Sequence, residues 1–380
     1  MSKAADLANL IGNINAGGGG VNRNAIINGS MNVAQRGTSS TGLGASSGYF
    51  VCDRWRFSKG GDASAGRFTM TQDSSAPEGF ANSMKLDCTT ADTSIAAGEF
   101  LLIGQRIEGQ NMQTFAKGTS SAKPFAVSFY VKGNASATYV CELVDQDNSR
   151  QISKTFNVTT DWARIELSFP ADTTGTLDDD NAKSFELFIW LHAGSTYNSG
   201  TLNSSSWASL TNANRAVGGS SFFDSTDRTF FLTGVQLEVG QNPTEFEHEK
   251  FSQTLERCSR YYQKTKAASD TYKHFGLWFC AADTGGGGTG YGTVAVPLVT
   301  TMRTIPSLET TGTVSNYAIV AKNTNYALTT FSVDTGIDDG TINGQFYLNA
   351  YSGGGMGAGT AGAVRANNTA DAFVALDAEL

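Results

Sequence analysis

Carboxylates are the side chains of this sequence with the clearest capacity for chemistry. Four of them lie in or beside segments that alternate apolar and polar residues: Glu142, Asp145, Asp147 and Glu186. A pair of such acids flanking a glycosidic bond is the usual machinery of glycan hydrolysis. Acidic residues on exposed strands and loops are more commonly solvated, and the chain lacks the repeat pattern of a β-helical depolymerase. We therefore expect no enzymatic activity and keep glycan hydrolysis as an alternative.

Histidine and cysteine add little to this chemistry. His192, His248 and His274 are isolated in the sequence, without a serine elbow or a closely spaced metal ligand beside them. The cysteines are odd in number, widely spaced and never in a C-x-x-C arrangement: Cys52, Cys88, Cys141, Cys258 and Cys280. Such spacing favours buried thiols over a disulfide or zinc framework. We expect no catalytic residue and no organic cofactor.

Aromatic side chains are the best candidates for binding a ligand. Tyr130 and Trp190 alternate with the apolar faces of their segments, and Trp207 lies in a Ser- and Asn-rich stretch with no evident core to join. Because aromatic faces stack on pyranose rings while carboxylates bind hydroxyls, the glycan-binding candidates are Tyr130, Trp190, Trp207 and Glu142. The alternative is that these aromatic side chains are buried against a neighbouring subunit or the second face of the sandwich. Packing in the core or at a strand edge is expected for the other tryptophans: Trp55, Trp162 and Trp278.

One acidic stretch has residues that could ligate calcium. Asp172, Asp178 and Asp180 offer carboxylate oxygens, and calcium takes about six to eight oxygen ligands. The side chains of consecutive residues diverge, however, and residues 178–180 are all aspartate, which favours a solvated loop. A structural calcium ion and a loop without metal therefore both stay open.

Composition and charge limit the partners. The formal net charge of −8, with no run of Lys and Arg to offset it, argues against nucleic acid and anionic membrane surfaces. No segment approaches the roughly 18 apolar residues of a membrane span, and the amino terminus has no secretory signal. We expect a protein that is made in the cytoplasm and does not insert into a membrane.

Alternation of apolar and polar residues predicts a mostly β fold. Within 22–246, one face of Phe125–Val131 and one face of Phe185–Leu191 are apolar, and Trp162–Phe169 and Phe230–Glu238 behave similarly. Turn residues separate these runs, and the 43 glycines of the chain suit many turns rather than long helices. The pattern predicts an antiparallel jelly-roll β-sandwich over 22–246.

Three further segments flank the sandwich. Residues 1–21 predict a short anchor helix with Leu7, Leu10 and Ile11 as its docking side chains, followed by a Gly17–Gly20 tether; a frayed terminus is the alternative. A longer helix is expected from Glu245 to Lys266, forming a connector over 247–268. Residues 269–380 return to alternation and predict a second, smaller β-domain with Gly-rich loops.

Several motifs of the sandwich resemble those of carbohydrate-binding modules with a jelly-roll fold. They are Asn24–Met31, then Val127–Gly133, Thr160–Arg164 and Gly234–Gly240, in that order. The resemblance covers about 220 residues and concerns the fold more than the ligand.

A second resemblance concerns the end of the sandwich and the segment that follows it. Asn242–His248, leading into Cys258–Lys264, resembles a junction in tail-fibre and virion structural proteins of marine and cyanobacterial phages, as do Asn22–Gly29, Val33–Thr38 and Asp53–Trp55. The resemblance implies a virion structural protein, assembled as a homo-oligomer of trimeric type. It also implies attachment to other virion proteins through the N-terminal segment, and binding of a host-surface glycan or receptor. A head decoration or tail adaptor without receptor binding is the alternative position in the particle.

Overall fold

A computed structural model shows that the chain divides into two compact units. The description covers residues 3–5, 7–8, 11, 22–61, 65–267, 271–283, 290–333, 345–352, 356 and 359–380. One unit comprises Met1–Thr254 with Leu380, and the other comprises Leu255–Glu379. Each unit has its own apolar core.

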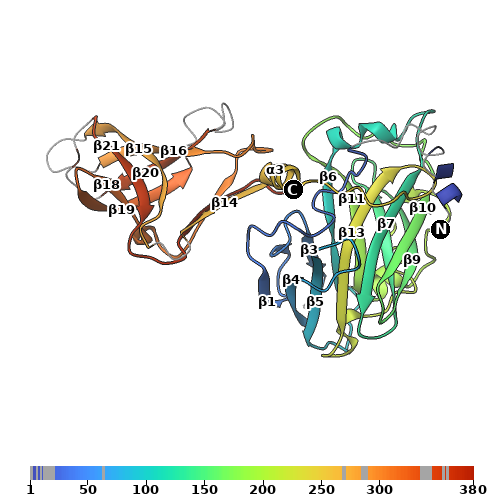
Figure 1. Cartoon of the computed structure of the whole chain (residues 1–380). Helices are drawn as coiled ribbons and strands as arrows, with labels where there is room; N and C mark the ends of the chain where they lie inside the picture. The colour runs from blue at the N-terminus through green and yellow to red at the C-terminus, as the bar shows by residue number, and fades with distance from the viewer. Residues whose placement is uncertain are drawn as a thin grey trace. The chain divides into compact units, whose positions relative to one another are not determined.

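The first unit is a sandwich of two antiparallel sheets (Figure 1). Its six-stranded sheet, here called sheet A, has the order β1 (Ser39–Leu43), β4 (Arg67–Asp73), β5 (Ser83–Thr90), β13 (Thr229–Val239), β7 (Phe125–Gly133) and β10 (Ala163–Phe169). Its seven-stranded sheet, sheet B, has the order β12 (Ala208–Ser209), β9 (Arg150–Val158), β8 (Ala137–Asp145), β11 (Lys183–Ala193), β6 (Phe100–Glu108), β3 (Arg56–Gly60) and β2 (Gly48–Tyr49).

Period-two alternation produces this sandwich. Along β7, Phe125, Val127 and Phe129 point into the common core, while the residues between them face outward. The inner residues of β11 do the same from sheet B, where Ile189 and its neighbours at every second position are fully buried. The predicted mostly β fold class is confirmed.

Short helical turns lie in the connections of the sandwich. They are η1 (Gly109–Asn111), η2 (Gln113–Phe115), α2 (Ser195–Asn198), η3 (Asn212–Asn214) and η4 (Phe222–Asp224). The turns α2, η3 and η4 all lie in the single excursion between β11 and β13.

At the amino terminus, the described residues 3–5, 7–8 and 11 are helical. Leu7 is 56% exposed and Ile11 is 48% exposed, so both side chains are free to contact another molecule. Leu10 and Gly17–Gly20 lie outside the described residues. None of the helices in the described part of the chain has the length and apolar character of a membrane-spanning segment.

The second unit contains a closed barrel and a three-stranded sheet. The barrel has the order β15 (His274–Asp283), β16 (Gly290–Pro297), β20 (Gln345–Ser352), β19 (Thr324–Val333), β18 (Tyr317–Ala321) and β21 (Ala361–Ala366). The small sheet has the order β14 (Tyr262–Lys266), β22 (Phe373–Asp377) and β17 (Ser307–Thr310), and a turn η5 (Val314–Asn316) precedes β18. Trp278 lies in the barrel core, fully buried, and donates its indole N–H to the Ala350 carbonyl at 3.0 Å. The Gly285–Gly288 tract lies outside the described residues, as does most of Gly353–Gly357.

The connector helix is shorter than predicted. α3 spans Phe251–Ser259, and Tyr262–Lys266 is the strand β14, which pairs with β22 in register from Tyr262 opposite Asp377. Strand pairing therefore overrides the helical spacing of Tyr262. Before the helix, residues 245–250 have no regular secondary structure, and several of them take part in the contacts described next. The prediction of one helix from Glu245 to Lys266 is wrong at both ends.

Candidate functional site

Several of the motifs that resemble phage and carbohydrate-binding proteins meet in one place, here called the junction: residues 22–35 and 53–55 against 234–249. Asn24 is its central side chain and is 6% exposed. Its amide donates to the Val235 carbonyl at 3.1 Å, and its Oδ1 accepts the N–H of Leu237 at 3.0 Å. This side chain completes the backbone hydrogen bonding of β13, so its role is structural.

Charged groups close the junction on the other side. The fully buried Glu238 accepts the N–H of Thr244 at 2.6 Å and lies 3.3 Å from Arg23 Nε. The carboxylate of Glu247 accepts the N–H groups of Asn22 and Asn24, at 2.6 and 3.0 Å. Because the unpaired N–H groups of the entering chain are satisfied in this way, the glutamates before α3 hold the start of the sandwich.

Asn28 anchors the other half of the motif. It adopts a left-handed conformation (φ 58°), donates to the carbonyls of Val33 and Asp53, and accepts the indole N–H of Trp55 through its own carbonyl at 3.1 Å. Asparagine tolerates this conformation better than most residues. The spacing from Asn28 to Trp55 therefore reflects a turn locked by a tryptophan, and Trp55 is core, as predicted.

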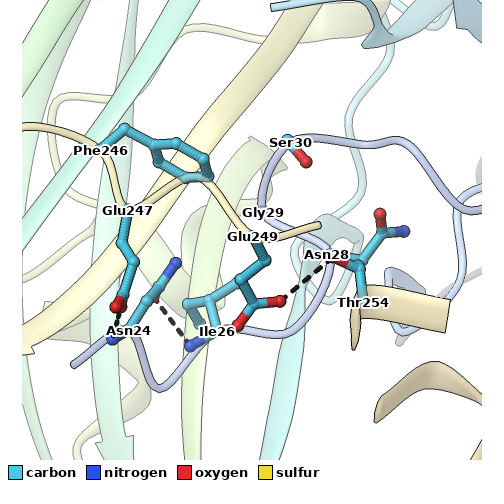
Figure 2. Close-up of a pocket in the computed structure, with 9 residues that line it drawn as sticks. All are labelled: Asn24, Ile26, Asn28, Gly29, Ser30, Phe246, Glu247, Glu249 and Thr254. Carbon is cyan, nitrogen blue, oxygen red and sulfur yellow. Dashed lines mark hydrogen bonds between the residues drawn. The ribbon is translucent and has the colours of Figure 1, made fainter. Parts of the chain in front are cut away.

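A small cavity lies within the junction (Figure 2). Its accessible space is about 10 Å³, which suffices for about one water molecule. The close-up shows Glu247 directed at Asn24, and Glu249 accepting a hydrogen bond from Thr254 at 3.1 Å. The residues that line it are Asn24, Ile26, Asn28, Gly29, Ser30, Phe246, Glu247, Glu249 and Thr254. The cavity is far too small for a sugar ring, so the junction is not where a glycan would bind.

Two of the glycan-binding candidates lie on the outer face of sheet B. Trp190 donates its indole N–H to Glu142 at 2.8 Å, and Arg215 makes two 2.9 Å bonds to the same carboxylate. The guanidinium carbon of Arg215 stands 4.9 Å from the centre of the Trp190 ring. Burial raises the pKa of Glu142, and Arg215 opposes that rise.

The excursion between β11 and β13 covers this face. The ring centres of Tyr197 and Trp190 are 5.4 Å apart, and Arg215 and Ala216 also cover Trp190. Trp190 is therefore 2% exposed, and Glu142 is fully buried. Neither side chain can contact a ligand in this arrangement, because the chain's own residues 194–221 occupy the space that a sugar would need. Trp190 and Glu142 are thus buried beneath an excursion of the same chain, which is neither of the two kinds of burial expected as alternatives.

Trp207 is also buried. The centre of its ring lies 5.4 Å from that of Phe125 and 6.0 Å from that of Phe185, and its indole N–H donates to the Pro170 carbonyl at 2.9 Å. The polar sequence around it conceals a side chain that enters the main core from the end of the sandwich. The prediction that Trp207 is available to a ligand is wrong for this reason.

The acids proposed as alternatives for hydrolysis are held in hydrogen bonds and ion pairs. Glu186 pairs with Arg106 at 3.0 Å and with Lys183 at 3.6 Å, across the outer face of sheet B. Asp147 accepts the N–H of Asp178 at 3.2 Å, and burial raises its pKa. Each carboxylate is thus directed at a group of its own chain.

The predicted calcium ligands divide between separate partners. Asp172 pairs with Arg150 at 2.7 Å and with Lys117 at 3.1 Å, whereas Asp178 accepts the Ser184 hydroxyl and Asp180 accepts the N–H of Ala182, both at 2.8 Å. Among the described residues, no group of three His, Cys, Asp or Glu side chains is arranged to hold a metal ion. Burial by itself would raise the pKa of Asp172, but Arg150 and Lys117 together lower it.

A lysine occupies the position that a cation would take. The ammonium of Lys117 is fully buried among the carboxylates of Asp145 and Asp172 and the carbonyls of Thr174 (3.0 Å) and Gly175 (2.9 Å); this group is here called the Lys117 cage. Oxygen ligands of two carboxylates and two carbonyls are what calcium prefers. The chain therefore supplies its own cation to this loop, which the sequence did not reveal because residues 117, 145 and 172 are far apart.

His192 also has partners that sequence spacing could not reveal. Its Nδ1 lies 2.8 Å from the Ser221 hydroxyl and its Nε2 lies 3.3 Å from Glu99. The Ser221 oxygen already accepts the N–H of Phe223 at 3.0 Å as the cap of η4, so the hydroxyl is a structural partner. Burial lowers the pKa of His192, and the carboxylates of Glu99 and Asp92 oppose that effect. These contacts connect Ser221, near the end of the excursion, to His192 of β11 and Glu99.

The outer face of sheet A carries a row of aromatic and charged side chains, here called the Trp162 row: Trp162, Lys132, Phe231, Lys85 and Asp87. The strand register places Lys132 opposite Phe231 and Phe231 opposite Lys85. Trp162 meets Phe231 edge to face with centroids 6.0 Å apart. Trp162 is half-buried and directly precedes β10, the edge strand of sheet A, so of the two positions expected for it the strand edge is correct and the core is not.

The charged members of the row remain in contact with solvent. Lys85 pairs with Asp87 at 2.9 Å, and these side chains are 26% and 31% exposed. The Lys132 ammonium lies 5.3 Å from the centre of the Trp162 ring and 4.7 Å from that of Phe231. The row thus presents ring surface and hydrogen-bonding groups together, which is the chemistry of sugar recognition.

Comparisons with known proteins identify no family for this chain and only distant structural similarity. No family model and no curated protein matches the chain. Among solved structures, the carbohydrate-binding module TmCBM61, in complex with β-1,4-galactotriose, is 10% identical over 57% of this chain and 99% of that chain, with a TM-score of 0.31. The family 11 carbohydrate-binding module of the cellulase Lic26A-Cel5E of Clostridium thermocellum is 14% identical over 55% and 98%, with a TM-score of 0.27. Similarity this low carries no argument about function.

Tyr130, the fourth glycan-binding candidate, lies on the same face as the Trp162 row. It is half-buried and packs 5.3 Å from Phe80, which in turn packs 5.0 Å from Phe246. Burial raises the pKa of Tyr130 while Arg164 opposes that rise. Of the four candidates it is the one that retains contact with solvent.

An open depression of about 670 Å³ lies at one end of sheet A. Its lining is Ala122, Pro124, Ser168, Phe169, Pro170, Ala171, Gln241 and Asn242. Phe169 is 1% exposed, so no ring face is available there for stacking. The Trp162 row is therefore the better candidate surface.

Proposed function

We propose that the sandwich is a glycan-binding module that binds without catalysis, through the Trp162 row. The observation that carries the proposal is the Trp162 row itself. The half-buried ring of Trp162 directly precedes β10, and the neighbouring strands β7, β13 and β5 add three charged groups and the ring of Phe231, which is 9% exposed. A pyranose ring can lie on the indole of Trp162, while Lys85 and Asp87 bind its hydroxyls. The half-exposed Tyr130 extends the same surface.

We further propose that the chain is a virion structural protein of tail-fibre type. Support comes from the phage-like motifs Asn22–Gly29 and Asn242–His248, which contact each other at the junction, and from the exposed Leu7 and Ile11, which could contact another virion protein. Homotrimeric assembly belongs to this proposal, as does binding of the glycan on a host surface. A head decoration or tail adaptor that binds no receptor is the second candidate, and a glycan hydrolase the third.

The experiment is a binding assay with a panel of neutral, uronic-acid and sulfated oligosaccharides. Trp162→Ala removes the ring while leaving the main core intact, and we expect at least a tenfold loss of affinity, about 1.4 kcal/mol. Tyr272→Ala is the matched control, because Tyr272 is an exposed aromatic of the second unit (42%). Equal binding by Trp162→Ala and the control would remove the row from the proposal. Release of reducing ends by the wild-type chain would favour the hydrolase instead.

A further inference from the structure

The cations of the outer face of sheet A differ in one respect, which is whether a carboxylate neutralises them. Lys85 pairs with Asp87 at 2.9 Å, and Arg164 lies 3.5 Å from Glu245 and also contacts Glu166. Lys132 stands between them on β7. Among the described residues its ammonium has the Ser75 hydroxyl at 2.9 Å and two aromatic rings as neighbours, and no carboxylate.

The position of this ammonium is fixed by its surroundings. The ammonium donates a hydrogen bond to the Ser75 hydroxyl, and it lies 5.3 Å from the centre of the Trp162 ring and 4.7 Å from the centre of the Phe231 ring. An ammonium has three N–H donors, so donors remain for a ligand. The rings attract the cation electrostatically and restrict its motion, so little side-chain entropy remains to be lost when an anion binds.

Among the cations of the outer face of sheet A named above, Lys132 is the one without a carboxylate partner. A neutral sugar would leave this charge without a counterion in the bound state. An acidic sugar that stacks on Trp162 would neutralise it, and a compact ammonium binds a carboxylate or a sulfate without the bidentate geometry that an arginine imposes.

We propose that the Trp162 row selects acidic glycans, with Lys132 binding the carboxylate or sulfate of a sugar whose ring lies on Trp162. This inference rests on the proposed glycan binding and specifies its ligand class. The ring contacts supply affinity for any pyranose, while Lys132 supplies the discrimination between acidic and neutral ones.

The test compares an oligomer of galacturonic acid with the same oligomer after its carboxyl groups have been reduced, by calorimetry at about 50 and 300 mM NaCl. Wild type should bind the acidic oligomer at least tenfold more tightly, and the preference should shrink at the higher salt because charge interactions are screened. A sulfated oligosaccharide forms the second acidic probe. Whichever acid is preferred, Lys132→Met should abolish the preference, and Lys132→Arg should restore most of it.

Lys154→Met is the matched control. Lys154 is also half-buried, with its ammonium 5.7 Å from the Phe169 ring, but it is not part of the row. The Lys154→Met variant should bind both oligomers as wild type does. Equal unfolding temperatures of Lys154→Met and Lys132→Met would confirm that both variants are folded. If wild type binds reduced and acidic oligomers equally, the selectivity inference fails while glycan binding stands. If it binds no member of the panel, glycan binding itself fails.

Discussion

Replacing Lys117 by methionine tests whether the Lys117 cage organises its end of the sandwich. Methionine keeps the apolar stem but removes an ammonium that is fully buried between Asp145 and Asp172. Removing one partner of a buried ion pair costs about 3–5 kcal/mol, because the remaining charge stays buried. Asp172 keeps Arg150 at 2.7 Å, so the uncompensated charge falls mainly on Asp145, and we expect about 3 kcal/mol from the lower end of that range.

The assay is urea unfolding of the whole chain, followed by a signal of the sandwich, with Lys154→Met as the control. The pKa of Asp172 is lowered in the folded protein, so the wild type gains stability from this group above the pKa of the unfolded chain, about 3.9, and loses it as pH falls through the folded pKa. The variant has lost part of that contribution. The difference in unfolding free energy between wild type and variant should therefore stay constant from neutral pH to about pH 4 and narrow below that pH.

Calcium supplies the decisive comparison. The vacated cage keeps two carboxylates and the carbonyls of Thr174 and Gly175, which are ligands that Ca²⁺ prefers. Calcium at about 100 times its dissociation constant would restore about 2.7 kcal/mol to Lys117→Met and nothing to wild type. A loss below about 1 kcal/mol with no response to calcium would refute the idea that the lysine acts as the cation of this loop.

Two further predictions concern the excursion over sheet B. Arg215→Met should destabilise the chain by about 3 kcal/mol, because Glu142 is left buried without its guanidinium, and adding Glu142→Gln should recover part of that loss in urea unfolding. If the double variant is as unstable as the sum of the two single variants, the pair is not coupled. The pKa of His192 is lowered in the folded state, so the unfolded chain binds more protons below about pH 6.5 and stability falls on acidification from there. His192→Gln should flatten this dependence between about pH 7.5 and 5.5, and an unchanged slope would show that another group causes it.

The strands were predictable because their signal is local. Alternation in Phe125–Val131 and Phe185–Leu191 requires no knowledge of distant residues, and the side chains face as expected. The connector helix was overestimated because its last residues satisfy a helical spacing and a strand alternation equally. Pairing of Tyr262 with Asp377, more than a hundred residues later, decides between them, and no local pattern contains that partner.

The candidate site was harder to predict because exposure is a property of the whole fold. Trp190 does point away from the apolar face of its strand, as alternation predicts, but residues 194–221 return and cover it. Alternation placed Trp162 at the start of a strand and led us to expect packing in the core or at a strand edge, yet its ring lies beside Lys132 and Phe231 on the outer face of sheet A. Alternation identifies which side of a sheet a residue occupies, and only the complete chain determines what lies over that side.

The junction explains why recognisable motifs and candidate ligand contacts fall on different residues. Asn24 and Asn28 have nearly all their hydrogen-bonding capacity directed at backbone groups that would otherwise be buried and unpaired, and Glu238 binds the backbone and hydroxyl of Thr244 together with Arg23. Side chains in such positions are dictated by the closure of the sandwich, and the same pattern would suit any chain that enters and leaves a sandwich in this way. Lys132 and Trp162 close nothing, since they lie on a solvent-facing surface where packing tolerates many residue types. A resemblance carried by the junction therefore identifies the scaffold, and the ligand must be sought in outward-facing residues whose identity the scaffold does not require.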